Sequence, residues 1–317
     1  MISEKKALES VLYSVINNDE EAIKHFKINP ETLTRYKRLI KEKYQIEQLD
    51  QPNNLKKIRE LYSDKELSAI ANGGRIIPGK DKVPIIDFDG EYIKFGVISD
   101  THYGSIYSDP EYTDYALDEF DRKDCDFVVH VGDVTEGMSN RAGHVYELSH
   151  IGYEKQREHA IEVLSKWKGK MYLISGNHDR WYIKSNGANI VKDIAEKLPD
   201  GEFLGHDEGN ISLNGMAELR LWHGEDGNSY ATSYRIQKVV ESFTGGDKPH
   251  ILVLGHVHKS LYVYDRHIHC VGAGSIQKQS KWMRGKRIAA HTGFWIIEAW
   301  INEGVSKFRQ MWYPFYV

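Results

Sequence analysis

The stretch "KMYLISGNHD", Lys170 to Asp179, joins an apolar run to a turn made of small and polar residues. The run "KMYLIS" predicts a short buried strand, and Gly176 to Asp179 predicts the turn that follows it. Turns of this composition follow many strands, so the stretch alone indicates nothing about chemistry. Its meaning depends on whether other strands of the chain end in similar side chains.

Four other apolar runs also end in side chains that can bind a metal. Asp100 and His102 follow "YIKFGVIS", Asp133 follows "DFVVHVG", His223 follows "LRLW", and His256 and His258 follow "HILVLG". An extended chain leaving the first of these strands would place Asp100 and His102 on the same side. Ligands of open α/β sheets bind beyond the carboxyl ends of the strands, so we expect all these residues and Asn177 to form one cluster.

The side-chain types in this predicted cluster indicate a metal centre and limit the choice of metal. The cluster combines carboxylate, amide and imidazole groups and contains no thiolate, which argues against a closed structural zinc site. Mixed oxygen and imidazole ligands suit transition metals better than Mg²⁺ or Ca²⁺. We therefore expect Mn²⁺, with Fe, Zn²⁺ or Ni²⁺ as alternatives.

The same apolar runs predict the fold class. From about Tyr92 they alternate with helical patterns such as "YEKQREHAIEVLSKWK", which is typical of an α/β domain with buried strands. Residues from about 5 to 45 have a helical pattern almost throughout. We predict a helical, helix-turn-helix-like domain at 1–48, a linker with one helix at 49–90, and a sheet-centred domain at 91–317.

The composition is that of an ordinary globular chain. It has 317 residues, a net charge of −4 and two cysteines, Cys125 and Cys270. A role with nucleic acid would therefore need a local basic surface. The first residues, "MISEKKALES", lack the apolar core of a signal peptide, and no apolar run is long enough to span a membrane. We expect a cytoplasmic protein with reduced cysteines and no membrane partner, and the pattern leaves homo-oligomerisation open.

The motifs D-x-H, G-D, G-N-H-D, H and G-H-x-H occur in this order, each after a predicted strand. In this respect the chain resembles the calcineurin-like metallophosphoesterases over about residues 92 to 300. The resemblance implies a four-layer α/β/β/α sandwich, so we predict this fold together with the small all-α N-terminal domain. It also implies two divalent ions, with a hydroxide bridging them that hydrolyses a phosphoester.

The resemblance further implies a role for each motif residue. Asp100, His102, Asp133 and His258 would bind one ion, and Asp133, Asn177, His223 and His256 would bind the other. His178 would protonate the leaving group, Glu136 would orient His178, and Asp179 would support the loop. For Glu136 the alternative is an exposed loop residue without a role.

The segment between the second and third motifs, "MSNRAGHVYELSHIGYEKQREH", is polar and rich in histidine. Loops at this rim contact substrate in the family, so Arg141 and His144 are candidate phosphate contacts. The alternative is a structural cap that closes the metal cleft.

The N-terminal stretch "DEEAIKHFKINPETLTRYKRLIKEKY" predicts two helices joined by a tight turn. Asn29 would cap the second helix, and Pro30 would occupy its first position. Leu33, Tyr36 and Leu39 would form its inner face at a spacing of three residues.

The outer face of that second helix is basic and polar. It would carry Thr34, Arg35, Lys37, Arg38 and Lys41, which suit phosphates and base edges of DNA. Lys27 stands where such turns usually have glycine. The alternatives are a small helical bundle with a solvated basic face and an oligomerisation module.

Departures from the family pattern bear on the substrate. The Ser/Thr phosphatases of the family have an arginine where this chain has Gly137, and G-N-H-E instead of G-N-H-D. Its repair exonucleases usually have a histidine where this chain has Glu136, although "VGAGSIQKQS" after the last motif resembles their ending. The version with Glu136 also resembles bacterial cyclic-nucleotide phosphodiesterases.

From these observations we expect a DNA-directed nuclease or phosphodiesterase, with DNA as the partner. One alternative is a phosphoesterase for a small molecule, either a cyclic nucleotide or a phosphomonoester. The other is a non-catalytic DNA-binding protein whose metal centre is structural.

Overall fold

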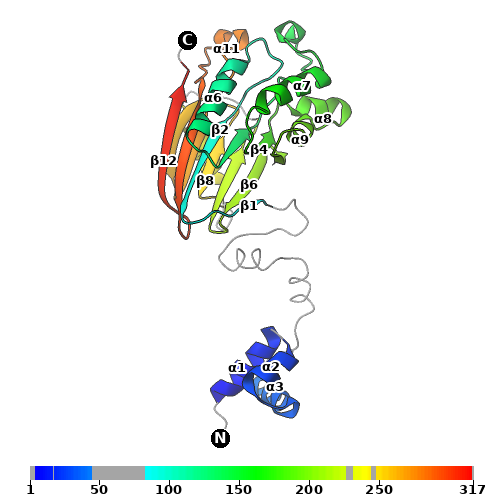
Figure 1. Cartoon of the computed structure of the whole chain (residues 1–317), viewed down its shortest axis with the longest axis vertical. Coiled ribbons are helices and arrows are strands. Elements are labelled where there is room, and N and C mark those ends of the chain that lie inside the picture. The colour runs from blue at the N-terminus through cyan, green and yellow to red at the C-terminus, as the bar shows by residue number, and fades with distance from the viewer. Residues whose placement is uncertain (1–3, 17, 45–82, 226–230, 244–247, 316–317) are drawn as a thin grey trace. The chain divides into compact units, whose positions relative to one another are not determined.

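The computed structural model describes residues 4–16, 18–44, 83–225, 231–243 and 248–315 (Figure 1). The chain forms two compact units, Met1–Ser68 and Ala69–Val317. Most of the predicted linker at 49–90, including its helix, lies outside the described residues, so that assignment stays a prediction. Among the described residues, no helix combines the length and the apolar character needed to cross a bilayer.

The N-terminal unit is helical, in agreement with the prediction. Its helices are α1 (Glu4–Ile16), α2 (Asp19–Phe26) and α3 (Pro30–Tyr44). Asn29 caps α3, because its Oδ1 accepts a hydrogen bond from the backbone N–H of Thr32 at 2.7 Å. Lys27 ends α2 in a left-handed conformation with a φ of 50°, which explains why glycine is usual in this turn.

The core of this unit follows helical spacing. Ala22, Leu33 and Tyr36 are buried, as expected for the inner faces of α2 and α3. The prediction for Leu39 is wrong, because its side chain is 48% exposed and Ile40 is buried instead. A helix has 3.6 residues per turn, so a face that contains Leu33 and Tyr36 continues four residues later rather than three.

The second unit contains two six-stranded sheets within the described residues. The first sheet has the order β12-β11-β2-β3-β4-β5, with β2 (Tyr92–Ile98), β3 (Phe127–Val131), β4 (Lys170–Ser175), β5 (Gly201–His206), β11 (Gly293–Ile301) and β12 (Val305–Pro314). The second has the order β1-β6-β7-β8-β10-β9, with β1 (Ile85–Ile86), β6 (Glu208–Leu213), β7 (Ala217–Trp222), β8 (Ile251–Leu254), β9 (Ser260–Asp265) and β10 (Ile268–Ala273).

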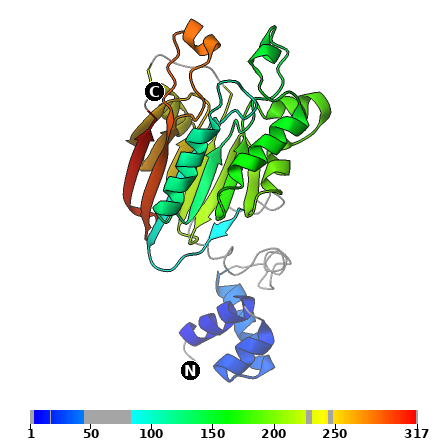
Figure 2. The same cartoon turned by 45° about the horizontal axis from the view of Figure 1, so that its top comes forward.

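Helices cover the outer faces of both sheets, so the unit has four layers (Figure 2). The helices of this unit are α6 (Pro110–Arg122), η1 (His144–Glu147), α7 (Tyr153–Leu164), α8 (Arg180–Asn186), α9 (Ile190–Ala195), α10 (Tyr234–Ser242) and α11 (Lys281–Gly285). Helices α6 to α9 pack on the first sheet, and α10 packs on the second. Between the sheets, residues such as Phe95 and Val129 face Leu221 and Val253 in a common core. The predicted α/β/β/α sandwich is confirmed.

Strand direction creates the edge at which the motifs meet. β2, β3 and β4 are parallel neighbours in the first sheet, and β7 and β8 are parallel neighbours in the second. The carboxyl ends of these strands therefore lie at one edge of each sheet. The apolar runs "YIKFGVIS", "DFVVHVG", "KMYLIS" and "HILVLG" form β2, β3, β4 and β8, as predicted. β5 and β6, with sequences "GEFLGH" and "EGNISL", were not predicted because their apolar pattern is weak.

Candidate metal centre

The loops that leave β2, β3, β4, β7 and β8 carry the predicted metal ligands. Asp100, Asp133 and His223 are almost completely buried, at 1% exposure or less. We expected the chain to leave β2 in an extended conformation. This prediction is wrong, because φ is 51° at Asp100 and 47° at His102. Sharp turns of the backbone therefore bring these two side chains together, rather than the alternation of a strand.

One group of ligand atoms lies around Asp100. Its Oδ1 is 3.0 Å from Nε2 of His258 and 3.9 Å from Nε2 of His102. The two imidazole Nε2 atoms are 3.3 Å apart. The ligand atoms of these three residues all lie within 4.8 Å of one another, which is close enough for them to share one metal ion.

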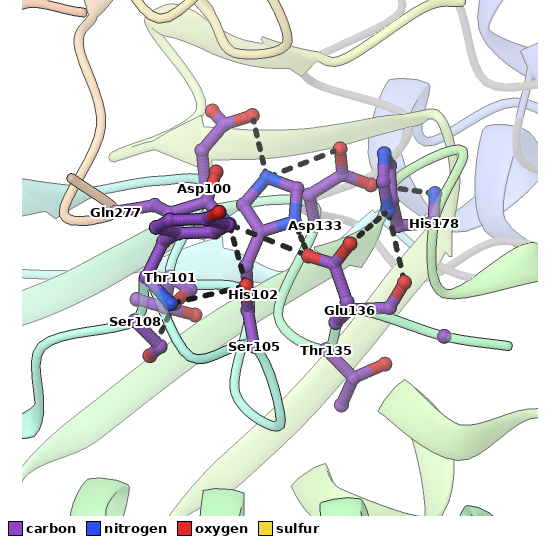
Figure 3. Close-up of polar contacts among 12 residues, drawn as sticks. Asp100, Thr101, His102, Ser105, Ser108, Asp133, Thr135, Glu136, His178 and Gln277 are labelled. Atoms are coloured by element: carbon purple, nitrogen blue, oxygen red, sulfur yellow. Dashed lines mark hydrogen bonds and ion pairs between the residues drawn. The ribbon is translucent and has the colours of Figure 1, made fainter. Parts of the chain in front are cut away.

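A second group lies around Asp133. Its Oδ2 is 3.1 Å from Nε2 of His223, and His256 completes a group whose ligand atoms lie within 4.8 Å. Oδ1 of Asn177 is 2.8 Å from Nδ1 of His256. The Oδ2 atom of Asp133 is also 3.8 Å from Nε2 of His102, so Asp133 connects the two groups (Figure 3). The structure thus brings together all seven residues that were expected to bind metal.

Packing requires the glycine with which three of the motifs begin. A Cβ atom at Gly176 would lie 2.3 Å from Oδ1 of Asp133. At Gly132 and Gly255 it would lie 2.4 Å and 2.7 Å from Nδ1 of His223. Any side chain at these positions would displace a predicted ligand, which explains the glycine in G-D, G-N-H-D and G-H-x-H.

Unpaired buried atoms show that the cluster fits a cation. Oδ1 of Asp100 and Nε2 of His223 form no well-aligned hydrogen bond within the described residues, although Nε2 of His258 lies 3.0 Å from the first and Oδ2 of Asp133 lies 3.1 Å from the second. Nδ1 of His223 donates to the backbone oxygen of Val131 at 2.6 Å, which leaves a lone pair on Nε2 facing Asp133. Burying converging acceptors without a partner is costly, and a divalent cation would satisfy them.

The electrostatics of the cluster also favour positive charge. Burial lowers the pKa of His223, but the carboxylates of Asp133 and Asp100 outweigh it and raise this pKa to about 10. Burial raises the pKa of Asp133, yet the imidazoles of His223 and His178 hold it well below its usual range. The two buried carboxylates thus attract positive charge, either a proton or a metal ion. The proton and the metal ion compete for the same atom, Nε2 of His223.

His178 lies beside the cluster and is oriented by main-chain groups. Its Nδ1 donates to the backbone oxygen of Glu136 at 2.9 Å, whereas Oε1 of Glu136 is 3.7 Å away. Its own backbone N–H donates to Oδ1 of Asp133 at 2.8 Å. Burial lowers the pKa of His178, but Asp133 and Glu136 outweigh it and raise that pKa above the ordinary histidine value.

The carboxylate of Glu136 contacts other histidines more closely than His178. Glu136 is 6% exposed, so it is not the exposed loop residue that we considered as an alternative. Its Oε2 is 3.0 Å from Nδ1 of His102, and its Oε1 is 2.8 Å from Nε2 of His144. A carboxylate on the second nitrogen of a metal-binding histidine fixes the ring and its tautomer. The side chain of Glu136 is therefore placed to orient His102.

Gln277 belongs to this network and was missed in the sequence. Its Nε2 donates to Oε2 of Glu136 at 3.3 Å, and its backbone N–H donates to the backbone oxygen of Asp100 at 3.1 Å (Figure 3). The one available signal was the stretch "VGAGSIQKQS" after the last motif, which contains this residue.

Asp179 connects two of the motif loops. Its carboxylate accepts hydrogen bonds from the backbone N–H groups of Thr135 at 2.7 Å, Gly176 at 2.9 Å and Val134 at 3.1 Å. Burial and the nearby Asp133 raise the pKa of Asp179 to about 6, against the effect of these donors. Its contacts tie the loop after β4 to the loop after β3, which agrees with a supporting role.

The two candidate substrate contacts differ in their surroundings. His144 is 2% exposed, and its Nδ1 accepts a hydrogen bond from the backbone N–H of Ser139 at 3.1 Å. Its Nε2 contacts Oε1 of Glu136 at 2.8 Å, so His144 has a structural role, as in the alternative of a structural cap. Arg141 is exposed and pairs with Glu147.

Comparison with known proteins gives partial matches. The chain is 23% identical over 219 residues to a DNA polymerase II small subunit from Methanothermobacter thermautotrophicus, a match that covers 58% of this chain and 44% of the relative. The chain therefore spans less than half the length of this curated relative.

Solved structures of phosphoesterases are also similar. One is a novel archaeal phosphodiesterase, at 15% identity and a TM-score of 0.42, with coverage of 70% of this chain and 100% of the other. Another is a phosphoesterase from E. coli, at 16% identity and a TM-score of 0.39, with coverage of 68% and 98%.

The family comparison covers most of the sandwich. The family model described as "Calcineurin-like phosphoesterase superfamily domain" matches residues 93–291. This range includes every predicted metal ligand, and both the fold and the two aspartate–histidine groups imply divalent metal ions. Because the match extends over well more than half of the sequence, the chain belongs to the calcineurin-like phosphoesterase superfamily.

Proposed function

We propose that this chain is a two-metal phosphodiesterase that acts on DNA. Membership of the superfamily supports phosphoester hydrolysis in general. The observation that carries the proposal is the convergence of two groups of ligand atoms on Asp133, with His178 beside them. A purely structural metal site would need no further histidine held beside the two groups, as His178 is held by the backbone oxygen of Glu136.

The residues fit two ions that share Asp133. Asp100, His102 and His258 would hold the first, and Asn177, His223 and His256 would hold the second. Two divalent ions at such a site neutralise charge on a phosphoryl group and lower the pKa of a bound water. Glu136 would keep the Nε2 lone pair of His102 directed at the first ion, through its contact with Nδ1.

His178 is the proposed general acid. Its Nδ1 is held by the backbone oxygen of Glu136, so the proton that it can give up is the one on Nε2. The carboxylates of Asp133 and Glu136 favour the protonated ring. Such a group can transfer a proton to the leaving oxygen of a phosphodiester, a step that commonly contributes ~10²–10⁴-fold to rate.

Two features support DNA as the substrate. One is the similarity to a DNA polymerase II small subunit, although it is limited to 23% identity. The other is the geometry of α2 and α3, two helices joined by a tight turn, with Arg35 and Arg38 exposed on α3. Lys37 is less available, because it pairs with Asp19 at 2.8 Å. We accordingly propose a DNA-binding unit at 1–48, a linker at 49–90 and a catalytic unit at 91–317.

Hydrolysis of bis(p-nitrophenyl) phosphate with Mn²⁺ tests the catalytic part of the proposal. We expect activity in the wild type and a loss of at least ~100-fold in His178→Asn. The matched control is His267→Asn, since His267 is an exposed histidine at the turn between β9 and β10. Equal activity of His178→Asn and wild type would remove His178 from the mechanism, and an inactive wild type would contradict the enzyme itself.

Substrate preference needs separate measurements. Cleavage of single- and double-stranded DNA should exceed cleavage of cyclic AMP, and the reverse order would favour the small-molecule alternative. Duplex affinity should fall in Arg35→Glu/Arg38→Glu but not in Lys197→Glu/Lys307→Glu, which changes charge equally on the sandwich. If both double variants bind DNA like the wild type, the N-terminal unit does not bind DNA through this face.

A further inference from the structure

The segment between β10 and β11 forms an ordered projection that the proposed mechanism does not use. It contains α11, whose first turn is capped by Ser280 through the backbone N–H of Met283 at 3.2 Å. The side chain of Met283 is 6% exposed and anchors the projection. Nε2 of Gln279 donates to the backbone oxygen of Ile288 at 2.8 Å and closes its base. The projection therefore has a defined shape of its own.

Both ends of this projection are attached to the candidate metal centre. At its start, the backbone N–H of Gln277 donates to the backbone oxygen of Asp100 at 3.1 Å. At its end, the backbone N–H of His291 donates to the backbone oxygen of His258 at 2.8 Å. In Figure 2, α11 stands above the edge of the sandwich at which the strands β2 to β4 end. A ligand bound to α11 would therefore lie at the edge of the sandwich that carries the metal ligands.

The projection is strongly basic although the chain as a whole is slightly acidic. No Asp or Glu occurs between Asp265 and Glu298. The exposed cations of the projection are Lys278, Lys281, Arg284, Lys286 and Arg287. Lys278 pairs with Asp109 at 2.6 Å, and the other four form no ion pair within the described part of the chain. Four unpaired cations within seven residues create a local positive surface that repels other cations and attracts polyanions.

An exposed tryptophan lies among these cations. Trp282 is 50% exposed, while its neighbour Met283 is buried, so packing of the projection does not require the indole. An aromatic ring between cations is the arrangement with which proteins bind single-stranded nucleic acid, because bases stack on the ring while phosphates contact the cations. In a duplex the bases are already stacked on one another, so this ring favours an unpaired strand.

An anionic membrane surface is the other polyanion to consider, and the structure disfavours it. Interfacial helices bury a continuous apolar face, whereas α11 is five residues long. Of its two large apolar side chains, Met283 points into the protein and only Trp282 is exposed.

We propose that residues 278–291 bind single-stranded nucleic acid and guide it to the metal centre. Trp282 stacks on a base, and Arg284, Lys286 and Arg287 contact the flanking phosphates. This inference rests on the proposed phosphodiesterase function, since it assigns a substrate strand to the same edge of the sandwich. It adds a binding surface on the catalytic unit that is separate from the basic face of α3.

Binding is measured on the full chain by fluorescence anisotropy with labelled oligo-dT and a chelator, so that no cleavage occurs. Three phosphate contacts predict a slope of log affinity against log salt of about −2, or ~20-fold weaker binding between about 50 and 200 mM salt. Trp282→Ala should weaken binding by ~5- to 100-fold, and Trp282→Phe should retain most of it.

Arg284→Glu/Lys286→Glu should weaken binding and flatten the salt dependence. Lys197→Glu/Lys307→Glu is the matched control with the same charge change. Circular dichroism should show that all variants are folded. If Trp282→Ala and Arg284→Glu/Lys286→Glu both bind oligo-dT with wild-type affinity, the inference is overturned. It is also overturned if the wild type binds phosphatidylserine vesicles through these residues but does not bind oligo-dT. Hydrolysis of bis(p-nitrophenyl) phosphate, measured in parallel, reports on the proposed function alone, because that substrate is too small to need the projection.

Discussion

Gly176 lies where the turn after β4 touches Asp133 and His223. A Cβ atom there would come within 2.3 Å of Oδ1 of Asp133 and 2.6 Å of Nε2 of His223. Only glycine, which has no Cβ atom, therefore fits at this position beside the two predicted ligands. At the scale of single residues, the backbone of Gly176 thus packs directly against two predicted metal ligands.

Substitution of this glycine tests that contact. We expect Gly176→Ala to lower Mn²⁺ affinity by at least ~10-fold, because the methyl group displaces Asp133 or His223 from its position. Isothermal titration calorimetry measures the affinity. Gly285→Ala is the control, since nothing lies within 4 Å of a Cβ atom at Gly285. Unchanged affinity in Gly176→Ala would contradict the observed packing.

His130 shows how a buried histidine affects stability. It is fully buried in β3, with Nε2 at 2.9 Å from Oγ1 of Thr101. That hydroxyl donates to the backbone oxygen of Val134, so it accepts the Nε2 proton of a neutral His130. Burial lowers the pKa of His130 to about 3.

This shift predicts a pH dependence of stability. Between pH 6.5 and about 3 the unfolded chain binds a proton at His130 and the folded chain does not, so the free energy of unfolding falls as pH decreases. The contribution of this residue is at most about 1.4 kcal/mol per pH unit. Urea unfolding at several pH values should give a smaller pH slope for His130→Gln than for the wild type. Equal slopes would show that His130 does not carry the effect.

At the scale of elements, the turn between α2 and α3 contains a strained residue. Lys27 has a φ of 50° and a ψ of 51°, a conformation that costs a residue with a Cβ about 1–2 kcal/mol. We expect Lys27→Gly to stabilise the N-terminal helices by up to ~1 kcal/mol.

The control for this prediction is Lys24→Gly, which places the same change inside α2 and should destabilise it by about 1 kcal/mol. Hydrogen exchange of α2 and α3 amides in the full chain measures both effects. Faster exchange in Lys27→Gly than in the wild type would contradict the prediction.

The elements also show how far the sequence pattern could predict. β2, β3, β4 and β8 were predicted, because a strand buried on both faces is a continuous apolar run. β5 and β6 were missed, since their exposed positions and glycines dilute that signal. Leu39 was assigned to the wrong face, because three-residue spacing drifts from the true period of a helix within two turns.

At the scale of the whole molecule, the candidate metal centre joins the two sheets of the sandwich. Asp100, Asp133 and Asn177 follow strands of the first sheet, and His223 and His256 follow strands of the second. Ions bound between them would connect the carboxyl edges of both sheets. Metal binding should therefore stabilise the sandwich as a unit.

Removing the metal tests this connection. Mn²⁺ at about 100 times its dissociation constant should add ~2.7 kcal/mol to the free energy of unfolding and raise Tm, and a chelator should reverse the change. Differential scanning calorimetry measures Tm, and Asp133→Asn should abolish its dependence on Mn²⁺. Amide exchange in α1 to α3 should not respond, because these helices belong to the other compact unit. A Tm that is insensitive to both Mn²⁺ and chelator would contradict the metal centre.

The sequence by itself determined an α/β domain with buried strands and the set of residues that meet at the edge of its sheets, and the four-layer sandwich was implied by the resemblance of its motifs to the family. Apolar runs report burial, and parallel strands end at a common edge, so the residue that follows each run is placed by local pattern and topology alone. For this reason Asp100, Asp133 and His223 could be assigned to one cluster before the structure was known.

Only the tertiary structure decided which atoms face one another. The left-handed turns at Asp100 and His102, and the contacts of Glu136 with His102 and Gln277, arise from packing between loops that are distant in sequence. Side-chain direction in such loops depends on backbone angles that neighbouring segments impose, and no periodic pattern encodes them. The backbone hydrogen bonds that attach the basic projection to Asp100 and His258 also join segments distant in sequence, so the sequence pattern did not predict them.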